Sequence, residues 1–468
     1  MSNSKLLARV DIPIYMVKVV SERHILVAGG GGQAKTGVKN AVEIYQLTHS
    51  SNTSEPCSAK LVNRFYTGSR AIMSGTVFEN DKLSILAGGG INGECLLWRM
   101  RLLTNYDREP VHIGNGNARS SSNDALNLRR RRTSSSSSIG GGVGGDDVID
   151  STEHGLRSRN NSTASNDSRR QSEDISFENG SILGFELSQM SAFKTDFPEK
   201  EEPFVKVIRY NDVLSALVTG GADGHIRIWR YPDIVKQTDI RAHTDEIDDL
   251  DIHPRGTVIA SVSRDSHGYI WDANMGRKQY ELKVQMPVIK NSNQPVKYVM
   301  RGCRFGLVID SKPTTYKLFT VHNPATRHKP PHPAYLCKWD ANNYTVEKLS
   351  SIGPIMVSSM AISDDGRFIG IGTQEGSVEI YIAFSLQRQY ICPQAHNIFV
   401  TGLEFLKTCQ ETQLLNGDND SSLVSISVDR RIVIHNIPKQ RTIGLYGLMF
   451  CFVITIMSIF YILEYIGL

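Results

Sequence analysis

Short runs of alternating apolar and polar residues recur along the chain, each linked by a tight turn to the next. The clearest copy is residues 220–229, GGADGHIRIW, and residues 263–272, SRDSHGYIWD, repeat it. Residues 372–381 and 427–435 are two further copies, the last with a histidine where the others end on an aromatic residue. A period of two residues predicts β-strands, and the Gly- and Asp-containing turns predict hairpins between them.

The residues that end these strands define a longer repeat, with degenerate copies in addition to the four clear ones. The positions are Tyr45, Trp98, Trp229, Trp271, Trp339, Tyr381 and His435. The intervals from 229 to 271 and from 339 to 381 are each 42 residues, which is typical of one WD-type blade. The pattern resembles the WD-repeat superfamily and predicts an all-β, seven-bladed β-propeller.

The two ends of the repeat array predict how the ring closes. Residues 14–20, 25–28 and 41–47 are expected to be the first three strands of blade one, which leaves residues 5–12 as a spare strand. Blade seven has room for only three strands, the last ending near Ile437. The spare strand should complete blade seven, because this pairing removes two exposed sheet edges.

Residues 104–178 do not fit the repeat. They are rich in Ser, Asn, Gly and Arg, with four consecutive arginines, Arg129, Arg130, Arg131 and Arg132. Such a segment cannot bury enough apolar surface to offset the entropy of ordering it, so we expect a disordered insert between the third and fourth strands of blade two. The four arginines could form a phosphate-binding patch or a solvated run, and both readings stay open.

The C-terminal stretch from Ile443 to Leu463 contains 21 residues without a charge. A helix of about 20 residues crosses a hydrocarbon core of about 30 Å. Lys439 and Arg441 precede the stretch, which favours a cytosolic N-terminal side. We therefore expect a propeller at 1–437, a linker at 438–442, a transmembrane helix at 443–463 and a lumenal tail at 464–468.

The composition fits a cytosolic globular protein, with 40% hydrophobic and 21% charged residues. A net charge of +4 is too small to argue for a nucleic-acid partner by itself. The seven cysteines form no Cys-x-x-Cys pair, so they indicate reduced thiols rather than a zinc site. Asn52, Asn161, Asn166 and Asn419 satisfy the Asn-x-Ser/Thr pattern but should stay unglycosylated on the cytosolic side.

The most unusual segment is residues 29–40, GGGGQAKTGVKN, in the second hairpin of blade one. Blade three has only a short turn at the equivalent place. The segment is not a nucleotide-binding P-loop, because Val38 follows Gly37 and no βαβ unit is present. It could be a flexible hairpin or a loop with a binding function, and the residues alone leave both readings open.

Two histidines and two aspartates are weaker candidates for chemistry. His243 and His396 precede the first strands of two blades, and Asp265 and Asp429 occupy later turns. No nucleophile or metal cluster accompanies them. We expect them to form structural hydrogen-bond networks.

The glycine-rich motif, in the first blade of a seven-bladed WD propeller with a C-terminal anchor, resembles the prolactin regulatory element-binding protein family. Members of that family are guanine-nucleotide exchange factors of the endoplasmic reticulum (ER) membrane. They act on the Sar-type small GTPase that starts assembly of the COPII vesicle coat, in ER-to-Golgi transport, and COPII coat components are further candidate partners.

The resemblance implies exchange by loop insertion, without covalent catalysis. It also implies a potassium ion held by backbone oxygens of the loop from Gly30 to Asn40. The positions carried over as GTPase contacts are Gly30, Gly31, Gly32, Lys35, Thr36, Gly37 and Asn40. The alternatives are a membrane-tethered WD scaffold without exchange activity and a DNA-binding transcriptional regulator.

The strand order also predicts an orientation. In an up-and-down blade the loops between strands two and three share one rim with the connections to the next blade. The glycine-rich loop should therefore lie on the rim opposite the one from which the chain leaves blade seven near Ile437.

Overall fold

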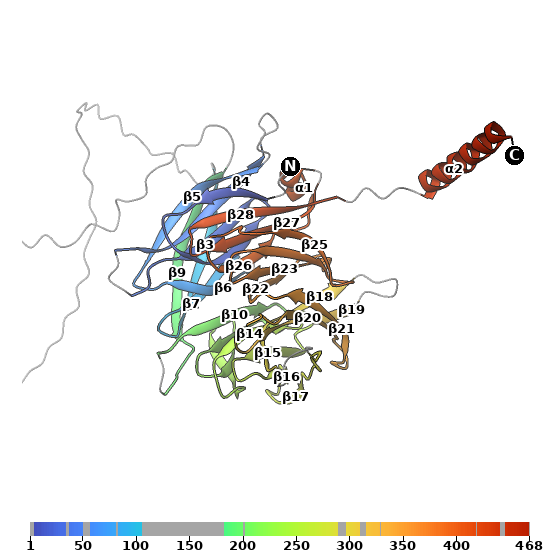
Figure 1. Cartoon of the computed structure of the whole chain (residues 1–468). Helices are drawn as coiled ribbons and strands as arrows, with labels where there is room; N and C mark the ends of the chain where they lie inside the picture. The colour runs from blue at the N-terminus through green and yellow to red at the C-terminus, as the bar shows by residue number, and fades with distance from the viewer. Residues whose placement is uncertain are drawn as a thin grey trace, which may run out of the picture. The chain divides into compact units, whose positions relative to one another are not determined.

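The computed structural model describes residues 4–33, 37–49, 57–80, 83–104, 182–199, 202–288, 296–308, 315–327, 329–417, 419–439 and 445–467. Within these residues, seven antiparallel sheets of four strands each form a β-propeller (Figure 1). The innermost strands of successive blades contact one another around the ring, and blade seven contacts blade one. The predicted all-β, seven-bladed fold is confirmed.

In the first three blades the strands, from innermost to outermost, are as follows. Blade one contains β2 (Ile14–Ser21), β3 (His24–Gly29), β4 (Asn40–His49) and β5 (Cys57–Gly68). Blade two contains β6 (Ile72–Asn80), β7 (Leu83–Gly90), β8 (Glu94–Thr104) and β9 (Ile182–Lys194). Blade three contains β10 (Val205–Asn211), β11 (Ala216–Gly221), β12 (His225–Arg230) and β13 (Val235–Arg241).

The remaining blades follow the same order. Blade four contains β14 (Ile247–Ile252), β15 (Val258–Ser263), β16 (Gly268–Asp272) and β17 (Lys278–Glu281). Blade five contains β18 (Tyr298–Val308), β19 (Thr315–Pro324), β20 (Ala334–Asp340) and β21 (Val346–Gly353). Blade six contains β22 (Val357–Ile362), β23 (Phe368–Thr373), β24 (Val378–Ile382) and β25 (Gln387–Cys392). Blade seven contains β26 (Val400–Phe405), β27 (Asn419–Ser427), β28 (Arg431–Pro438) and β1 (Ser4–Arg9).

The N-terminal strand closes the ring as predicted. β1 pairs antiparallel with β28, so that Ser4 lies opposite His435 and Arg9 opposite Arg431. The strand is shorter than the expected range of 5–12. The short helix α1 (Gln410–Asn416), between β26 and β27, was not predicted.

Burial changes from strand to strand within a blade. Every residue of the second strands β3, β11, β15 and β23 is buried, because neighbouring blades cover both faces of these strands. Most residues of the outermost strand β13 are exposed. The aromatic positions of the repeat lie on the third strands, and all seven are buried. The indole nitrogens of Trp229, Trp271 and Trp339 each donate to a hydroxyl on the adjacent second strand.

The two rims of the propeller carry different connections. The loop rim holds the turns between second and third strands and the connections between blades, and the exit rim holds the other turns. The loop from Gly30 to Asn40 is on the loop rim, and the amide of Gly30 donates to the carbonyl of Pro13, 2.9 Å away, in the connection from β1 to β2. Ile437 and Pro438 line a pocket with Gly366, from a turn on the exit rim. The predicted opposite placement is confirmed.

The C-terminal part contains the helix α2 (Leu445–Ile466). Among the described helices, none is long and apolar enough to cross a membrane. The transmembrane helix predicted at 443–463 is therefore unconfirmed. The insert predicted at 104–178, with its four arginines, lies outside the described residues, except for Thr104 at the end of β8.

Candidate functional site: the glycine-rich loop of blade one

The loop connects β3 to β4, and the structure describes its two ends. Gly30, Gly31 and Gly32 leave β3, and the segment from Gly37 returns to β4 at Asn40. Lys35 and Thr36, two of the carried-over positions, lie outside the described residues. The described ends therefore define the base of the loop.

Glycine is required at the base of the loop for two reasons. Gly30 has a φ of +137°, and a Cβ atom there would lie 2.3 Å from Oδ1 and 2.5 Å from Cα of Asn40. Gly37 has a φ of +77° with open space around it. At Gly30 both backbone conformation and close contact exclude a side chain, whereas at Gly37 only the conformation disfavours one.

Asn40 fastens the two ends of the loop together. Its side-chain Oδ1 accepts a hydrogen bond from the amide of Gly32 at 2.9 Å. Its Nδ2 donates to the carbonyls of Gly32 and of Gly68, each at 2.9 Å. Asn40 is only 3% exposed, so its side chain holds the loop in place and is not presented at the surface.

The loop also rests on the neighbouring turn of blade two. The side-chain amide of Gln33 donates to Oδ1 of Asn92, and a Cβ atom added at Gly32 would lie 2.8 Å from Cδ1 of Ile91. The next contact leads to the connection between blades two and three, because the carbonyl of Gly93 accepts from the amide of Thr195 at 2.8 Å. Sequence reasoning missed this support, which has no signature beyond an ordinary Asn-Gly turn.

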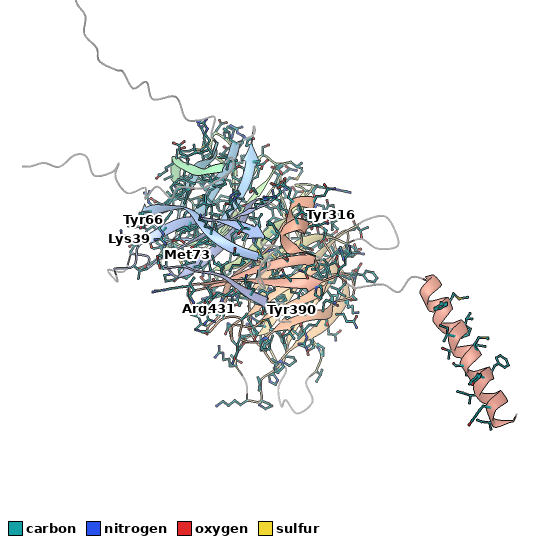
Figure 2. All side chains as sticks on the ribbon, turned by 90° about the horizontal axis from the view of Figure 1, so that it is seen from above. Lys39, Tyr66, Met73, Tyr316, Tyr390 and Arg431 are labelled. Carbon is teal, nitrogen blue, oxygen red and sulfur yellow. The ribbon has the colours of Figure 1, made fainter. Side chains whose placement is uncertain are left out.

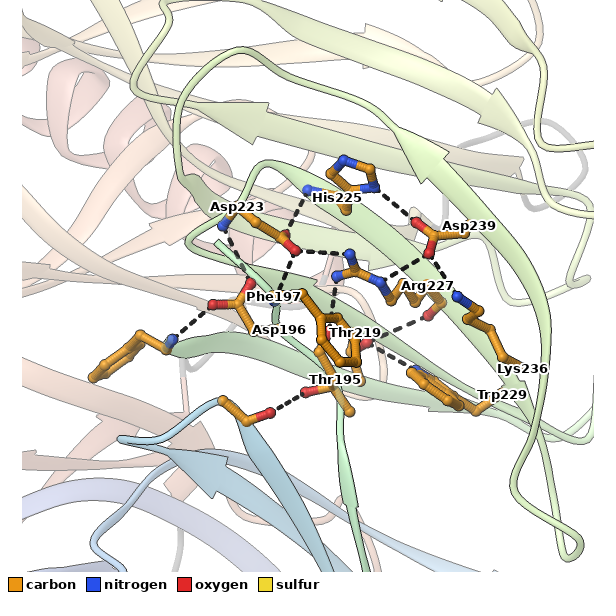
Figure 3. A network of polar contacts seen from close by, with 12 residues as sticks. Thr195, Asp196, Phe197, Thr219, Asp223, His225, Arg227, Trp229, Lys236 and Asp239 are labelled. Carbon is orange, nitrogen blue, oxygen red and sulfur yellow. Dashed lines mark hydrogen bonds and ion pairs between the residues drawn. The ribbon is translucent and has the colours of Figure 1, made fainter. Parts of the chain in front are cut away.

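A buried polar network fixes the connection between blades two and three (Figure 3). Arg227 donates to Asp223 at 2.7 Å, to Asp239 at 3.1 Å and to the carbonyl of Thr195 at 2.8 Å. Asp196 accepts from the amides of Phe204 and Asp223 at 2.7 and 3.1 Å. Burial, followed by the hydrogen bond with Asp223, raises the pKa of Asp196 to about 6.

The histidine and aspartate candidates have the structural role that was predicted. His243 contacts Asp265 at 3.0 Å and the Ser261 hydroxyl at 2.8 Å. That hydroxyl also accepts from the indole of Trp271 at 2.9 Å. Blade seven repeats the arrangement, with His396, Asp429, Ser425 and His435 in the same order.

The central channel contains a further group of charged side chains around a cavity of about 350 Å³. Arg301 pairs with Asp248 at 3.1 Å, and Arg209 pairs with Asp249 at 3.3 Å. These pairs link blades three, four and five. Because the charges neutralise one another within the protein, their evident role is to hold the blades together.

The chemistry of the loop suits a monovalent cation. Among the described residues, no group of three or more His, Cys, Asp or Glu side chains could hold a metal ion. The loop sequence itself contains no carboxylate, so its oxygen donors are backbone carbonyls, the side-chain amides of Gln33 and Asn40 and the hydroxyl of Thr36. Neutral carbonyl oxygens of this kind are the ligands that potassium takes in selective sites. Among these carbonyls, that of Gly32 already accepts a hydrogen bond from the Asn40 side chain, which occupies part of its capacity to bind a cation.

The repeated blades and the His–Ser–Trp networks define a WD-repeat propeller. The family model for the WD domain, G-beta repeat, matches residues 201–230 and 235–272. A solved structure of Raptor from Chaetomium thermophilum aligns over 93% of this chain with a TM-score of 0.54 and 11% identity. This chain spans only 28% of that protein, and the likeness shows the fold alone.

The curated relatives are more specific. The "Guanine nucleotide-exchange factor SEC12" of Rattus norvegicus is 32% identical over 444 residues, which are 95% of this chain and 93% of that protein. The protein of the same name from Mus musculus matches with the same identity and coverage. The chain belongs to the SEC12 guanine nucleotide-exchange factor family, which confirms the resemblance seen in the sequence.

Proposed function

We propose that this chain is a guanine-nucleotide exchange factor that activates a Sar-type small GTPase at the ER membrane and thereby starts COPII coat assembly and ER-to-Golgi transport. The observation that carries the proposal is the similarity to SEC12 exchange factors over nearly the whole chain. The site supports it, because the glycine-rich loop projects from a rigid scaffold and its base is held by Asn40. Neither the scaffold nor the DNA-binding alternative is favoured by these relatives.

The mechanism requires no covalent step. The loop must bind the nucleotide-free GTPase more tightly than the loaded one, and by linkage this weakens nucleotide binding by the same factor. A loop that is already held in place loses less conformational entropy on binding. Insertion of the loop would open the nucleotide site, and GTP would enter by mass action.

A potassium ion at the loop is part of the proposal. The backbone carbonyls between Gly30 and Asn40 would hold it, and the ion would rigidify the part of the loop that contacts the GTPase. If so, exchange should be faster in K⁺ than in Na⁺ at equal ionic strength. Equal rates in the two salts would remove the selective ion site and leave the exchange function standing.

We also propose that the segment from Ile443 to Leu463 anchors the chain in the ER membrane as a single span, with the propeller in the cytosol. Its support is the absence of charge over 21 residues and the preceding basic residues. A chain truncated after Lys439 should be released from membranes by a neutral wash. A truncated chain that stayed in the membrane fraction would locate the anchor elsewhere.

The central test is a nucleotide-release assay. The purified full chain in detergent is added to Sar-type GTPases loaded with a fluorescent guanine nucleotide, and release is followed after excess GTP is added. We expect a strong acceleration with at least one of them. A scaffold would bind without accelerating release. A DNA-binding regulator would instead show a steeply salt-dependent affinity for duplex DNA, lost when residues 104–178 are deleted.

A further inference from the structure

Two exposed aromatic side chains lie on the same rim as the glycine-rich loop. Tyr66, near the end of β5, is 49% exposed, and Phe197, just after β9, is 48% exposed. Tyr66 pairs with Ala41 across the sheet, which places it directly beside the base of the loop. Phe197 lies at the connection between blades two and three.

A cationic side chain lies close to each of these rings. The Lys39 ammonium lies 4.5 Å from the centroid of the Tyr66 ring, and the two are neighbours in Figure 2. The Phe197 ring is approached by Lys194 at 5.2 Å and by Arg227 at 5.0 Å. A cation near the face of an aromatic ring is attracted by its quadrupole. Arg227 is buried and paired with Asp223 and Asp239, so the exposed cations beside the two rings are Lys39 and Lys194.

A series of hydrogen bonds links the two aromatic positions along the loop rim. Lys39 precedes Asn40, whose side chain bonds to Gly32, the neighbour of Gln33. Gln33 donates to Asn92 in blade two, and the carbonyl of the adjacent Gly93 accepts from the amide of Thr195. Phe197 is two residues further, and its amide donates to Asp223 at 3.0 Å. We call the surface formed by Lys39, Tyr66, Asn92, Lys194 and Phe197 the aromatic strip.

A loop alone is too small to account for a specific interface. Stable complexes bury roughly 800 Å² on each partner, so a protein that receives the loop must also cover the rim on both sides of it. Exposed aromatic residues with fixed positions are typical energetic centres of such interfaces. The cations beside them favour acidic side chains on the other protein.

We propose that the small GTPase docks on the aromatic strip, with Tyr66 and Phe197 as anchoring contacts in addition to the inserted loop. The matching face of the GTPase is apolar at its centre and acidic at its edge. This inference rests on the proposed exchange function and extends it from the loop to blades one and two and the connection to blade three.

The test compares Tyr66→Ser and Phe197→Ser with a matched control. Phe384 is 50% exposed, and Lys338 lies 5.3 Å from its ring, but Phe384 occupies the turn between β24 and β25 on the exit rim. We expect each strip variant to lower kcat/KM for exchange roughly tenfold through a higher KM. Phe384→Ser should match the unmodified chain, and Tyr66→Phe should retain most activity.

A second measurement separates this proposal from the exchange function. Binding of the nucleotide-free GTPase to each full-length variant is measured directly by calorimetry. If the unmodified chain binds without accelerating release and the strip variants lose binding, the docking surface stands and the exchange function fails. Unchanged KM and binding in both strip variants would overturn the aromatic strip, as would an unmodified chain that does not bind. A dimer of the chain that both substitutions disrupt would also overturn it, by assigning the surface to a second copy.

Discussion

Asn40 makes three hydrogen bonds with a single buried amide, two to Gly32 and one to Gly68. Its partners are the backbone amide and carbonyl of Gly32 and the carbonyl of Gly68, which would lose these hydrogen bonds if the side chain were shortened. A buried polar group without a partner costs about 1–3 kcal/mol. The conformation of the loop base thus depends on the Asn40 side chain.

Asn40→Ala should therefore slow exchange about tenfold by releasing the loop base, a loss of roughly 1.4 kcal/mol in transition-state stabilisation. Nucleotide release is measured beside thermal unfolding of the same variant. Asn40→Asp is the control, because it keeps an acceptor for the Gly32 amide and loses both donations, and its rate should be intermediate. Full exchange activity in Asn40→Ala would show that the clamp is dispensable.

Asp265 makes the folding stability of the propeller depend on pH in the acidic range. Burial alone would raise its pKa, but hydrogen bonds from His243 and from the backbone amides of His267 and Thr244 outweigh burial, and the pKa falls from 3.8 to about 2. The folded state therefore binds this proton more weakly than the unfolded state. The resulting stabilisation is complete above about pH 4 and is lost as the pH falls toward about 2.

Asp265→Asn should lower the free energy of unfolding by roughly 2 kcal/mol at neutral pH. The difference from the unmodified chain should shrink between about pH 4 and pH 2. Urea unfolding at a series of pH values measures both quantities. A difference that stayed constant down to pH 2 would mean that charge on Asp265 is not what stabilises the network.

At the scale of elements, β3 and β4 can pair without the glycine-rich loop that connects them. Gly29 pairs with Ala41, so a two-residue turn can join the strands directly in place of residues 30–40. The period-two pattern predicted these strands well, because alternation and turn chemistry are local properties. The pattern missed α1, a helix of 7 residues whose first turn is capped by the side chain of Cys409.

Replacing residues 30–40 by Asn-Gly should preserve folding and reduce exchange at least tenfold, since the strands keep their register while the inserted element is lost. A Gly/Ser segment of the original length is the control for loop length, and it too should be inactive. If the two-residue turn kept normal exchange, the loop would have no part in the mechanism.

At the scale of the whole molecule, ring closure depends on a strand that lies far from its partner in sequence. β1 supplies the outer strand of blade seven, and it offers a matched pair of residues. Leu7 is 7% exposed and packs in the cluster shared by blades seven and one, whereas Leu6 is 41% exposed.

Leu7→Ala should lower the free energy of unfolding by about 2–3 kcal/mol, because it leaves a cavity at the closure. Leu6→Ala should cost little, since its side chain already contacts water. Chemical unfolding of both variants measures the difference. Equal and small effects would indicate that β1 contributes little to holding the ring shut.

The sequence by itself determined the number of blades, the closing strand, the position of the glycine-rich loop and the family. These properties depend on strand period, turn residues and the loop motif, and each of those is a feature of a short stretch of chain. The tertiary structure decided which distant residues meet. Tyr66 in blade one and Asn92 in blade two adjoin the same loop only because β4 pairs with β5 and neighbouring blades stand side by side in the ring. The clamp by Asn40 likewise requires β3, β4 and β5 to be paired in register, and pairing between strands is a property of the folded chain that no local pattern contains.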